Sequence, residues 1–497
     1  MKYKITEEPD FFLNAKNFLH QLTVVLKSSK WLHAEHGEVE TLIQKDGFEI
    51  LRLLFQGHLD ERAKTEIDLS SEAMDRSGRP YTRENCSRQL NSVFGTVEVR
   101  RKGYSDKGRD SVFPQHAELN LSRDSYSDGL RMKAAYSVSD LSFEKSTETI
   151  LKSTASSIPK RQIENVIRHL SQDFDSFYAS QEIDTRRQAG ILVLSCDGKG
   201  IIMRQADLRE ATQKAAAIAV HKKQTRLSRG EKRNRKRMAM VAAVYDIDPH
   251  MRSARSIMGL DEKESVPPKP RHKRVWASVE KPGVEVIRDM FLETLRRDPK
   301  QKHQWVILVD GHAAQLAAIK KVMKSFKIQG AAIVMDFVHV LEYLWKAAYC
   351  FHPETSQKAE KWVMERALKV LSGEAGLVAG GIRRSCTMLG LSKKNRENAD
   401  KCADYLLRKK AYLRYDSCLD MGYPIATGVI EGTCRYLVKD RLDITGARWS
   451  LKGAEAVLKI RALKSSNDIE EYFKFHKLQD RERNYPYFEA ISHKKAA

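Results

Sequence analysis

The chain has 497 residues, which is too many for one ordinary hydrophobic core, so we expect two to four structural units. Its 87 Lys and Arg outnumber 65 Asp and Glu, and the formal net charge of +22 favours a polyanionic partner over a small acidic substrate. No apolar stretch reaches the roughly 18 residues of a membrane span, and the opening residues lack the apolar core of a signal peptide. We therefore expect a cytoplasmic, nucleoid-associated protein that does not enter the membrane.

Helical periodicity dominates the first part of the chain. Residues 1–70 are predicted to form a helical N-terminal region. Residues 71–185 begin with polar turns around FGTVEVRRKGY, in which alternating valines precede Arg100 and Arg101. This alternation predicts a short exposed strand, whose basic edge can lie along a phosphate backbone. We interpret residues 71–185 as a mainly helical DNA-binding region with a short β segment.

Two helices separated by a short turn are predicted at 144–172. The turn lies near Pro159, and Lys160 and Arg161 open the second helix. This spacing permits a helix-turn-helix, in which the second helix contacts DNA. A plain helical hairpin that packs on a neighbouring element fits the same spacing, so the pattern leaves both interpretations open.

An α/β unit is predicted at 186–345. Its strand signal at 191–196 continues past an Asp-Gly pair, as a hairpin does, and later apolar strands alternate with helical segments, which is typical of a parallel α/β layer. The Lys- and Arg-rich run at 221–237 predicts a basic loop inserted between strands, which either clamps DNA or remains solvated. Residues 261–274 are predicted to form a second exposed loop.

Helical patterns return after the last predicted strand. Residues 346–424 contain no credible strand, so we interpret them as an all-helical insertion into the α/β unit. Residues 425–465 return to the core and include a helix that begins near Glu431. Residues 466–497 are a basic, polar tail for which we predict no regular structure.

Three acids stand out by their local sequence. Asp197 ends ILVLSCD, Asp310 ends WVILVD, and Glu431 opens IEGTCRYLVKDRL. An Asp after a strand can simply cap a helix or fix a turn, and for each Asp alone that explanation is the better one. Together, two strand-borne carboxylates and a third from a helix form the oxygen-rich set that Mg²⁺ or Mn²⁺ prefers. Two such ions about 4 Å apart suit phosphoryl transfer.

Further candidate residues surround these acids in sequence. Asp336 ends a third apolar run and His339 follows it by three residues, so the two can act as a unit that orients phosphate or water, or can form a hydrogen-bonded strand-to-helix joint. Arg435 and Lys439 follow Glu431 at helical spacing, which predicts one face of metal ligand and phosphate contacts or an ordinary charged surface helix.

The segment ITGARWS then offers a cation and an aromatic ring. Arg448 is a candidate contact to DNA, and Trp449 either stacks on an unpaired base or belongs to the core. The seven cysteines contain no CxxC pair, so we expect isolated reduced thiols and no zinc ribbon.

Four segments together resemble a known family. SCDGKG, LVDGHAAQ, MDFVHVLEYLW and PIATGVIEGTCRYLVKDRLDITGARWS are similar to bacterial insertion-sequence transposases of the ISKra family, which are Mutator-like DDE enzymes. The resemblance covers most of the chain, and its last segment is the most specific. It implies an RNase H-like catalytic core with an all-helical insertion before the Glu. It also implies that Asp197 on the first strand, Asp310 on the fourth strand and Glu431 form the metal-binding triad, with Asp336 and His339 as an auxiliary pair.

The resemblance also implies an activity. A DNA transposase of this kind binds the terminal inverted repeats of its element, hydrolyses a phosphodiester with two Mg²⁺ ions and joins the freed end to target DNA, with a homodimer expected on paired ends. Many relatives have paired N-terminal cysteines that look zinc-binding, whereas this region contains only Cys86. An inactive sequence-specific DNA-binding protein and an RNase H-fold nuclease without strand transfer remain the alternatives.

Overall fold

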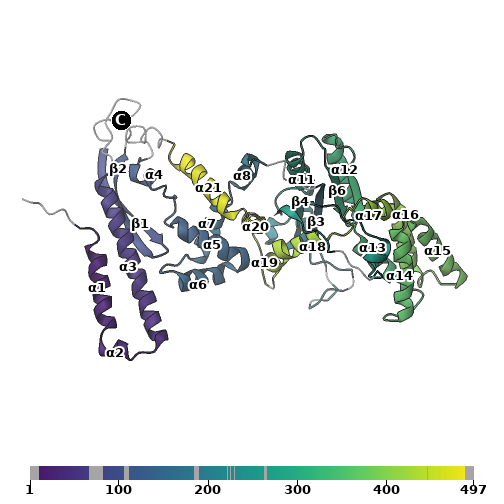
Figure 1. Ribbon diagram of the computed structural model, residues 1–497, viewed down its shortest axis with the longest axis horizontal. Helices are drawn as coiled ribbons and strands as arrows, with labels where there is room; N and C mark the ends of the chain where they lie inside the picture. Colours follow the sequence, from purple (N-terminus) through teal and green to yellow (C-terminus); the bar gives the residue numbers. More distant parts are fainter. Residues whose placement is uncertain are drawn as a thin grey trace, which may run out of the picture. The chain divides into compact units, whose positions relative to one another are not determined.

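The chain folds into two compact units. The computed structural model describes residues 10–66, 82–105, 111–183, 190–220, 222–223, 225–228, 230–261, 266–444 and 446–486. Unit 1 combines Met1–Ala179 with Asp468–Ala497, and unit 2 consists of Ser180–Asn467 (Figure 1). The C-terminal segment therefore belongs with the start of the chain, which the predicted order of segments did not indicate. The predicted boundaries at 70/71 and 185/186, and residues 487–497 of the predicted tail, lie outside the described residues.

Unit 1 begins with helices followed by a β-hairpin. The elements are α1 (Leu13–Leu26), α2 (Ser29–Leu32), α3 (His36–Lys64), β1 (Thr82–Ser92) and β2 (Gly95–Ser105). The two strands pair antiparallel across a two-residue connection, after which Gly95 has a φ of 122° that suits glycine. The strand predicted from FGTVEVRRKGY is the second arm of this hairpin. Its Val97 and Val99 are buried in one core with Leu59 and Leu90.

Six more helices complete unit 1. They are α4 (Pro114–Glu118), α5 (Asp128–Asp140), α6 (Phe143–Ser153), α7 (Lys160–Leu170), α8 (Phe174–Ser180) and α21 (Ile469–Asn484). Helices α5, α6 and α7 contact one another, so the predicted helical hairpin is part of a three-helix group. The prediction of no regular structure after residue 465 was wrong for α21. Its buried Tyr472, Phe473 and His476 give this polar segment a packing face.

Unit 2 is built on one mixed sheet. Its strands are β3 (Ile191–Ile202), β4 (Lys236–Ile247), β5 (Arg271–Ser278), β6 (Gln304–Val309) and β7 (Ala332–Met335), in the spatial order β5-β4-β3-β6-β7. The first three strands in sequence pair antiparallel, and β6 and β7 run parallel to β3. The hairpin predicted at the Asp-Gly pair does not form, because β3 continues without a turn to Ile202 and pairs with β4 along its length. The predicted loop at 261–274 was too long, because β5 begins at Arg271. The first half of β5 is charged because β5 is an edge strand of the sheet, so this half lacks the apolar pattern by which a strand is recognised.

Helices cover this sheet and support its loops. They are η2 (Gln205–Asp207), α9 (Glu210–Ala217), α10 (Ala254–Ile257), α11 (Gly283–Arg297), α12 (Ala313–Ser325) and α13 (Phe337–Ala348). Helix α11 packs on β3 and β4 and contacts α12. The apolar runs of the central strands are fully buried as a result, from Ile191 to Leu194 in β3 and from Val306 to Val309 in β6.

The region between β7 and Glu431 is helical throughout, as predicted for 346–424. It contains α14 (Gln357–Leu371), α15 (Ala375–Met388), α16 (Glu397–Lys409), η3 (Lys410–Tyr412) and α17 (Tyr415–Asp420). Figure 1 shows α14, α15 and α16 grouped together, and they contact each other in sequence order. The chain then forms α18 (Gly428–Thr433), the π-helix η4 (Cys434–Lys439), α19 (Asp440–Leu442) and α20 (Leu451–Ser465). All seven cysteines are unpaired thiols, as expected.

Candidate active site

Neighbouring parallel strands bring Asp197 and Asp310 to the same level of the sheet. The last paired positions of β3 and β6 are Ser195 and Leu308, and each aspartate lies two residues beyond its pair. Asp310 follows the end of β6, as predicted, and accepts a hydrogen bond from the amide of His312 at 2.9 Å. Asp197 does not end its strand, contrary to the prediction. Strand β3 continues to Ile202 because it still pairs with β4.

Asp336 is a buried acid at the start of α13. It is 2% exposed, and its Oδ1 accepts hydrogen bonds from the amides of Val338 at 3.1 Å and Thr427 at 3.2 Å. Its Oδ2 accepts a hydrogen bond from Thr427 Oγ1 at 2.8 Å. The same hydroxyl lies 3.1 Å from Oε1 of Glu431, so Thr427 links the two acids.

The helix of Glu431 also reaches Asp197. Cys434 is buried, and its thiol donates a hydrogen bond to Asp197 Oδ2 at 3.4 Å. Burial, followed by the nearby Asp197 carboxylate, raises the pKa of this thiol well above its ordinary value, so it remains a donor at neutral pH. Through Thr427 and Cys434, one short helical segment therefore contacts Asp336 and Asp197 from opposite ends.

A π-helical turn follows Glu431 and changes the predicted face. Regular α-helical spacing predicts that Glu431, Arg435 and Lys439 align, but residues 434–439 form a π-helix, which has more residues per turn. The buried guanidinium of Arg461 in α20 donates to the carbonyl oxygens of Tyr436 and Leu437 and holds this turn in place. Glu431, Arg435 and Lys439 are all exposed, so none of the three is engaged in the core.

The three predicted metal ligands approach each other without forming a closed site. Among the described residues, one group of three potential ligands has all its ligand atoms within 4.8 Å, and it does not include Asp197, Asp310 or Glu431. The observed links run from Asp310 to Asp197 through the sheet, from Asp197 to the Glu431 helix through Cys434, and from Glu431 to Asp336 through Thr427. The acids are thus gathered at one end of the central strands, but their carboxylates are not drawn together.

The predicted pairing of Asp336 with His339 is not observed. Asp336 is occupied by Thr427 and by backbone amides, and no hydrogen bond joins it to His339 within the described part of the chain. His339 instead lies 3.6 Å from Glu342 and has edge contacts with Tyr343 and Tyr405. It is a half-exposed side chain on the turn after Asp336.

The helical insertion contacts the acid-bearing loops directly. Tyr405 of α16 stacks on Tyr343 of α13 with ring centroids 4.1 Å apart. Burial, then the neighbouring Tyr343 and the acids Asp310 and Asp336, raises the pKa of Tyr405, so its hydroxyl keeps its proton. Lys409 from the same helix donates to the carbonyl of Gly311 at 2.8 Å. The insertion thereby fixes the segments that follow β6 and β7.

Two predicted DNA contacts in unit 2 have different environments. Arg448 is exposed, which leaves its charge available. Trp449 is only 6% exposed, its indole N–H donates to the carbonyl of Leu442 at 3.0 Å, and Arg441 lies over its ring. Trp449 is therefore a core residue, which is the second of the two interpretations that the sequence left open, and it is not available to stack on a base.

The predicted basic contacts in unit 1 also separate into two kinds. Lys160 and Arg161 are exposed at the start of α7, and Arg100 is exposed while pairing with acids at 3.3 and 3.5 Å. Arg101 is turned inward, where its guanidinium contacts His116 and lies over the ring of Phe113 at 4.0 Å. The predicted backbone contact by Arg101 is thus replaced by a structural role.

Sequence reasoning did not single out Thr427, Cys434, Tyr405 and Arg461. Thr427 and Glu431 are four residues apart, and Cys434 follows Glu431 by three, so helical spacing is the signal that could have found them. Tyr405 and Arg461 lie far from the acids in sequence, and only the packing of α16 and α20 reveals their contacts.

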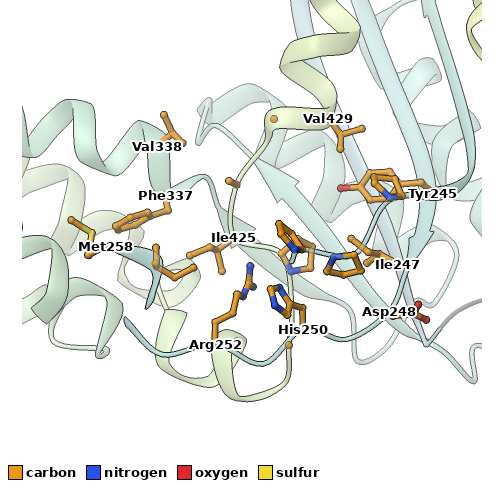
Figure 2. Close-up of a pocket in the computed structure, with 18 of the residues that line it drawn as sticks. Tyr245, Ile247, Asp248, His250, Arg252, Met258, Phe337, Val338, Ile425 and Val429 are labelled. Atoms are coloured by element: carbon orange, nitrogen blue, oxygen red, sulfur yellow. The ribbon is translucent and has the colours of Figure 1, made fainter. Parts of the chain in front are cut away.

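A cavity of about 660 Å³ adjoins the acid-bearing loops (Figure 2). Its lining includes Tyr245, His250, Arg252, Phe337, Val338 and Val429. Phe337 and Val338 directly follow Asp336 in sequence, and Val429 precedes Glu431 by two residues. Burial, then the charge of Arg252, lowers the pKa of His250, so this side chain is neutral at pH 7. The cavity is a mainly apolar neighbour of the acids.

Comparisons with known proteins do not assign a family. No protein-family model matches the sequence, and no curated protein matches it. Within the described ranges, no helix has both the length and the apolar character needed to cross a membrane. The function must therefore be inferred from the geometry of the acids and from the quoted sequence segments.

Proposed function

We propose that the protein is a metal-dependent DNA transposase with an RNase H-like core. One observation supports this most directly: the carboxylates of Asp197, Asp310, Asp336 and Glu431 form no ion pair within 4.0 Å with any described basic residue, although the chain has a net charge of +22. Acids gathered without basic partners repel one another, and divalent cations with hard oxygen preferences relieve that repulsion. The donor set fits Mg²⁺, with Mn²⁺ as a substitute, and two ions per site.

The topology of unit 2 agrees with the core that the resemblance implies. Asp197 lies on the first strand of the sheet in sequence, and Asp310 directly follows the fourth. The helical region α14–α17 separates the fifth strand from Glu431, as expected for an insertion before the last acid. The antiparallel pairing of the first three strands and the parallel pairing of the next two support the proposal of an RNase H-like fold.

In this proposal the acids of unit 2 bind the metal ions and its exposed basic residues bind phosphates. When bound, the two ions supply Lewis-acid stabilisation of phosphoryl oxygens and an activated water for hydrolysis. Asp197 lies within a buried strand, so its backbone position is fixed, whereas Glu431 is exposed and its Oε1 accepts a hydrogen bond from Thr427. Arg435, Lys439 and Arg448 are exposed cations that can bind phosphates, and their role is positional and electrostatic.

Unit 1 offers a surface for recognising the ends of an element. Helix α7 buries Ile163, Val166, Ile167 and Leu170 against its neighbours. Its opposite face exposes Lys160, Arg161, Gln162 and Asn165. Basic residues bind phosphates, and Gln and Asn are suited to adenine in the major groove, so this face favours a helix-turn-helix over a plain hairpin. Terminal inverted repeats and target DNA are the proposed partners, with a homodimer on paired ends and association with the nucleoid.

The test uses full-length protein, a labelled DNA fragment with the element's own end and a supercoiled target. We expect Mg²⁺-dependent nicking at the element boundary and joined products, both lost with EDTA and reduced more than 100-fold in Asp197→Asn and Glu431→Gln. Asp289→Asn, a half-exposed acid on α11 that pairs with Lys281, is the control and should retain activity. Gel shifts at fixed salt should show that the acid variants still bind DNA.

The alternatives predict different products. Cleavage without joined products in every condition would identify a nuclease without strand transfer. DNA binding without cleavage in Mg²⁺ or Mn²⁺, by protein supplied with paired ends, would identify an inactive DNA-binding protein. Activity that survives in both Asp197→Asn and Glu431→Gln would refute the assignment of these acids as ligands.

A further inference from the structure

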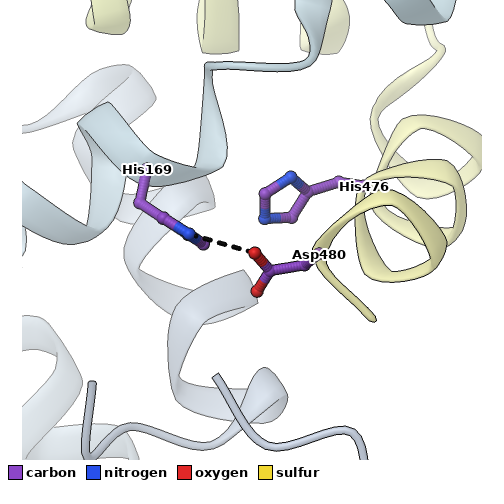
Figure 3. A group of neighbouring side chains, drawn as sticks. All are labelled: His169, His476 and Asp480. Atoms are coloured by element: carbon purple, nitrogen blue, oxygen red, sulfur yellow. Dashed lines mark ion pairs between the residues drawn. The ribbon is translucent and has the colours of Figure 1, made fainter. Parts of the chain in front are cut away.

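A group of three potential metal ligands lies within unit 1. It comprises His169 near the end of α7, and His476 and Asp480 on α21 (Figure 3). His476 and Asp480 are four residues apart, so one face of α21 presents both side chains. Figure 3 shows all three side chains converging on the space between the two helices.

The ligand atoms are close to the separations that a metal ion requires. His169 Nε2 lies 3.1 Å from Asp480 Oδ1, and all three ligand atoms lie within 4.8 Å of one another. The two imidazole rings meet edge to face with centroids 5.2 Å apart. A tetrahedral zinc ion with bonds of about 2.0–2.1 Å places its ligand atoms roughly 3.3 Å apart. Rotamer adjustments of about 1 Å would therefore close the site.

The hydrogen bonds of His476 leave one nitrogen available as a ligand. Its Nδ1 donates to Asp173 Oδ2 at 2.6 Å, and Arg483 holds the other oxygen of Asp173 at 2.6 Å. A neutral imidazole that donates from Nδ1 has a lone pair on Nε2. This Nε2 is fully buried and has no hydrogen-bond partner among the described residues, and the side chain is 1% exposed. A carboxylate behind a ligand histidine is the usual support of a metal site.

The third member of the group, Asp480, is only 4% exposed. Around it, the carboxylates of Asp124, Asp173 and Asp480 face the guanidiniums of Arg131 and Arg483, and Arg88 donates to the carbonyl oxygen of Asp124. A buried carboxylate beside two imidazoles supplies the oxygen ligand of the proposed site.

Contacts of two ligands must change when a metal binds. Asp480 Oδ1 lies 3.1 Å from His169 Nε2 and accepts a hydrogen bond from Arg483 Nη1 at 3.0 Å, so the ion would replace these contacts. Arg131 Nη2 donates to His169 Nδ1 at 3.1 Å, which assigns the His169 proton to Nε2. A metal at Nε2 displaces that proton and requires Nδ1 to become the donor. Arg131 keeps a second partner in Asp124, whose Oδ2 lies at 2.5 Å, so its guanidinium can turn away from His169 without losing its ion pair.

We propose that His169, His476 and Asp480 bind one zinc ion per chain. Two imidazole nitrogens and one carboxylate oxygen suit zinc better than Mg²⁺ or Ca²⁺, which prefer oxygen ligands, and a water molecule completes four-coordination. The ion joins α7, which exposes Lys160 and Arg161, to the C-terminal helix that returns to unit 1. The role is structural. It does not depend on the proposed transposase activity, because none of the unit 2 acids belongs to this site.

The test is zinc binding by full-length protein after treatment with a chelator. The Asp197→Asn, Glu431→Gln double variant serves as the background, so that zinc cannot be bound by those acids. Titration against a chromophoric chelator should show one tight site per chain. Asp480→Asn and His476→Asn should each weaken zinc binding at least 100-fold, whereas His116→Asn, which changes another buried histidine of unit 1, should leave it unchanged. Circular dichroism verifies that each variant is folded.

X-ray absorption at the zinc edge identifies the ligands without substituting any of the three. Two imidazoles and low-Z oxygen neighbours in a four-coordinate shell are expected. No stoichiometric binding, binding that is unaffected by Asp480→Asn and His476→Asn, or a shell that contains sulfur would each overturn the proposal. In those cases His476 belongs only to the hydrogen-bonded network that its Nδ1 forms with Asp173 and Arg483, and not to a metal site.

Discussion

Replacing Thr427 by Val removes one hydroxyl from the point where two carboxylates approach each other. Thr427 Oγ1 lies 2.8 Å from Asp336 Oδ2 and 3.1 Å from Glu431 Oε1. A hydroxyl has one proton, so it donates to only one of these oxygens at a time. Asp336 Oδ2 has no other partner among the described residues, whereas Glu431 is exposed to water. Removing the hydroxyl therefore mainly removes a hydrogen bond from the buried carboxylate of Asp336.

The magnitude follows from the burial of this oxygen. A hydrogen bond to a charged group contributes about 1.5–3 kcal/mol. In Thr427→Val, Asp336 Oδ1 still accepts hydrogen bonds from the backbone amides of residues 338 and 427, so the carboxylate keeps two of its three donors. We therefore expect Thr427→Val to lower the free energy of unfolding by about 2 kcal/mol, which corresponds to a fall in Tm of roughly 4–8 °C.

Scanning calorimetry of the metal-free protein measures this change in the transition of unit 2. Thr433→Val is the matched control, because Thr433 is also buried and β-branched, but its hydroxyl contacts neutral groups, the carbonyl of Val429 at 2.7 Å and the hydroxyl of Tyr436 at 3.0 Å. Loss of a hydrogen bond between neutral groups should cost only about 1 kcal/mol. A Tm for Thr427→Val within 1 °C of wild type, or one lowered no more than in the control, would refute the idea that this hydroxyl supports a buried anion.

Three other predictions concern single side chains. In the folded protein the pKa of Asp480 is lowered from 3.8 to about 2, against the effect of burial, so its charge contributes stability that is present above pH 4 and lost as pH falls toward 2. With a chelator present, the difference in unfolding free energy between wild type and Asp480→Asn should shrink by about 2 kcal/mol from pH 5 to pH 2. A difference that stays constant over this range would contradict the prediction. Gly422 has a φ of 72°, and a Cβ at this position would lie 2.4 Å from a backbone nitrogen, so Gly422→Ala should lower the unfolding free energy by more than about 1 kcal/mol. Gly428 is the control: it lies in a helix and a Cβ there would have no neighbour within 4 Å in the described part of the chain, so Gly428→Ala should not lower the unfolding free energy. The hydroxyl of Tyr405 is buried and has no hydrogen-bond partner among the described residues, so Tyr405→Phe should leave Tm unchanged or raise it. Tyr415→Phe removes a hydrogen bond to the carbonyl of Met335 at 2.8 Å and should lower Tm by several degrees, and equal effects in both variants would contradict this reasoning.

Apolar patterning predicted the parts of the fold that depend on local burial. The buried strands β3, β6 and β7 were recognisable because they contain runs of apolar residues, and the helices after β7 because each has apolar residues at helical spacing on one face. The edge strand β5 was not, because His272, Lys273 and Arg274 face a less buried environment. Helix α21 was missed for a related reason. Its packing residues are Tyr472, Phe473 and His476, which are too few and too polar to mark a helix in isolation.

The candidate site shows a similar division between local and distant causes. Asp310 and Asp197 were found because strands deliver them, yet periodicity placed Asp197 at a strand end, since an Asp-Gly pair resembles a turn. Pairing with β4 overrides that local signal and extends β3 to Ile202. The inward turn of Arg101 depends on Phe113 and His116, and Trp449 pairs through its backbone with the end of β3 at Ile202 and beyond. Composition could not distinguish these two side chains from exposed DNA contacts.

The π-helical turn after Glu431 explains why α-helical spacing wrongly predicted that Glu431, Arg435 and Lys439 lie on one face. An α-helix would bring residues 431, 435 and 439 into one row, but a π turn rotates the later residues away from the earlier ones. The turn needs partners for its displaced carbonyl groups, and Arg461 supplies them from α20 at Tyr436 and Leu437. The position of the exposed Glu431 is therefore set by buried contacts on both sides of it, with Thr427 before it and Arg461 behind the turn that follows. A ligand that moves Glu431 toward Asp197 must strain these contacts of Thr427 and Arg461. The contacts therefore limit how far the backbone of Glu431 can move.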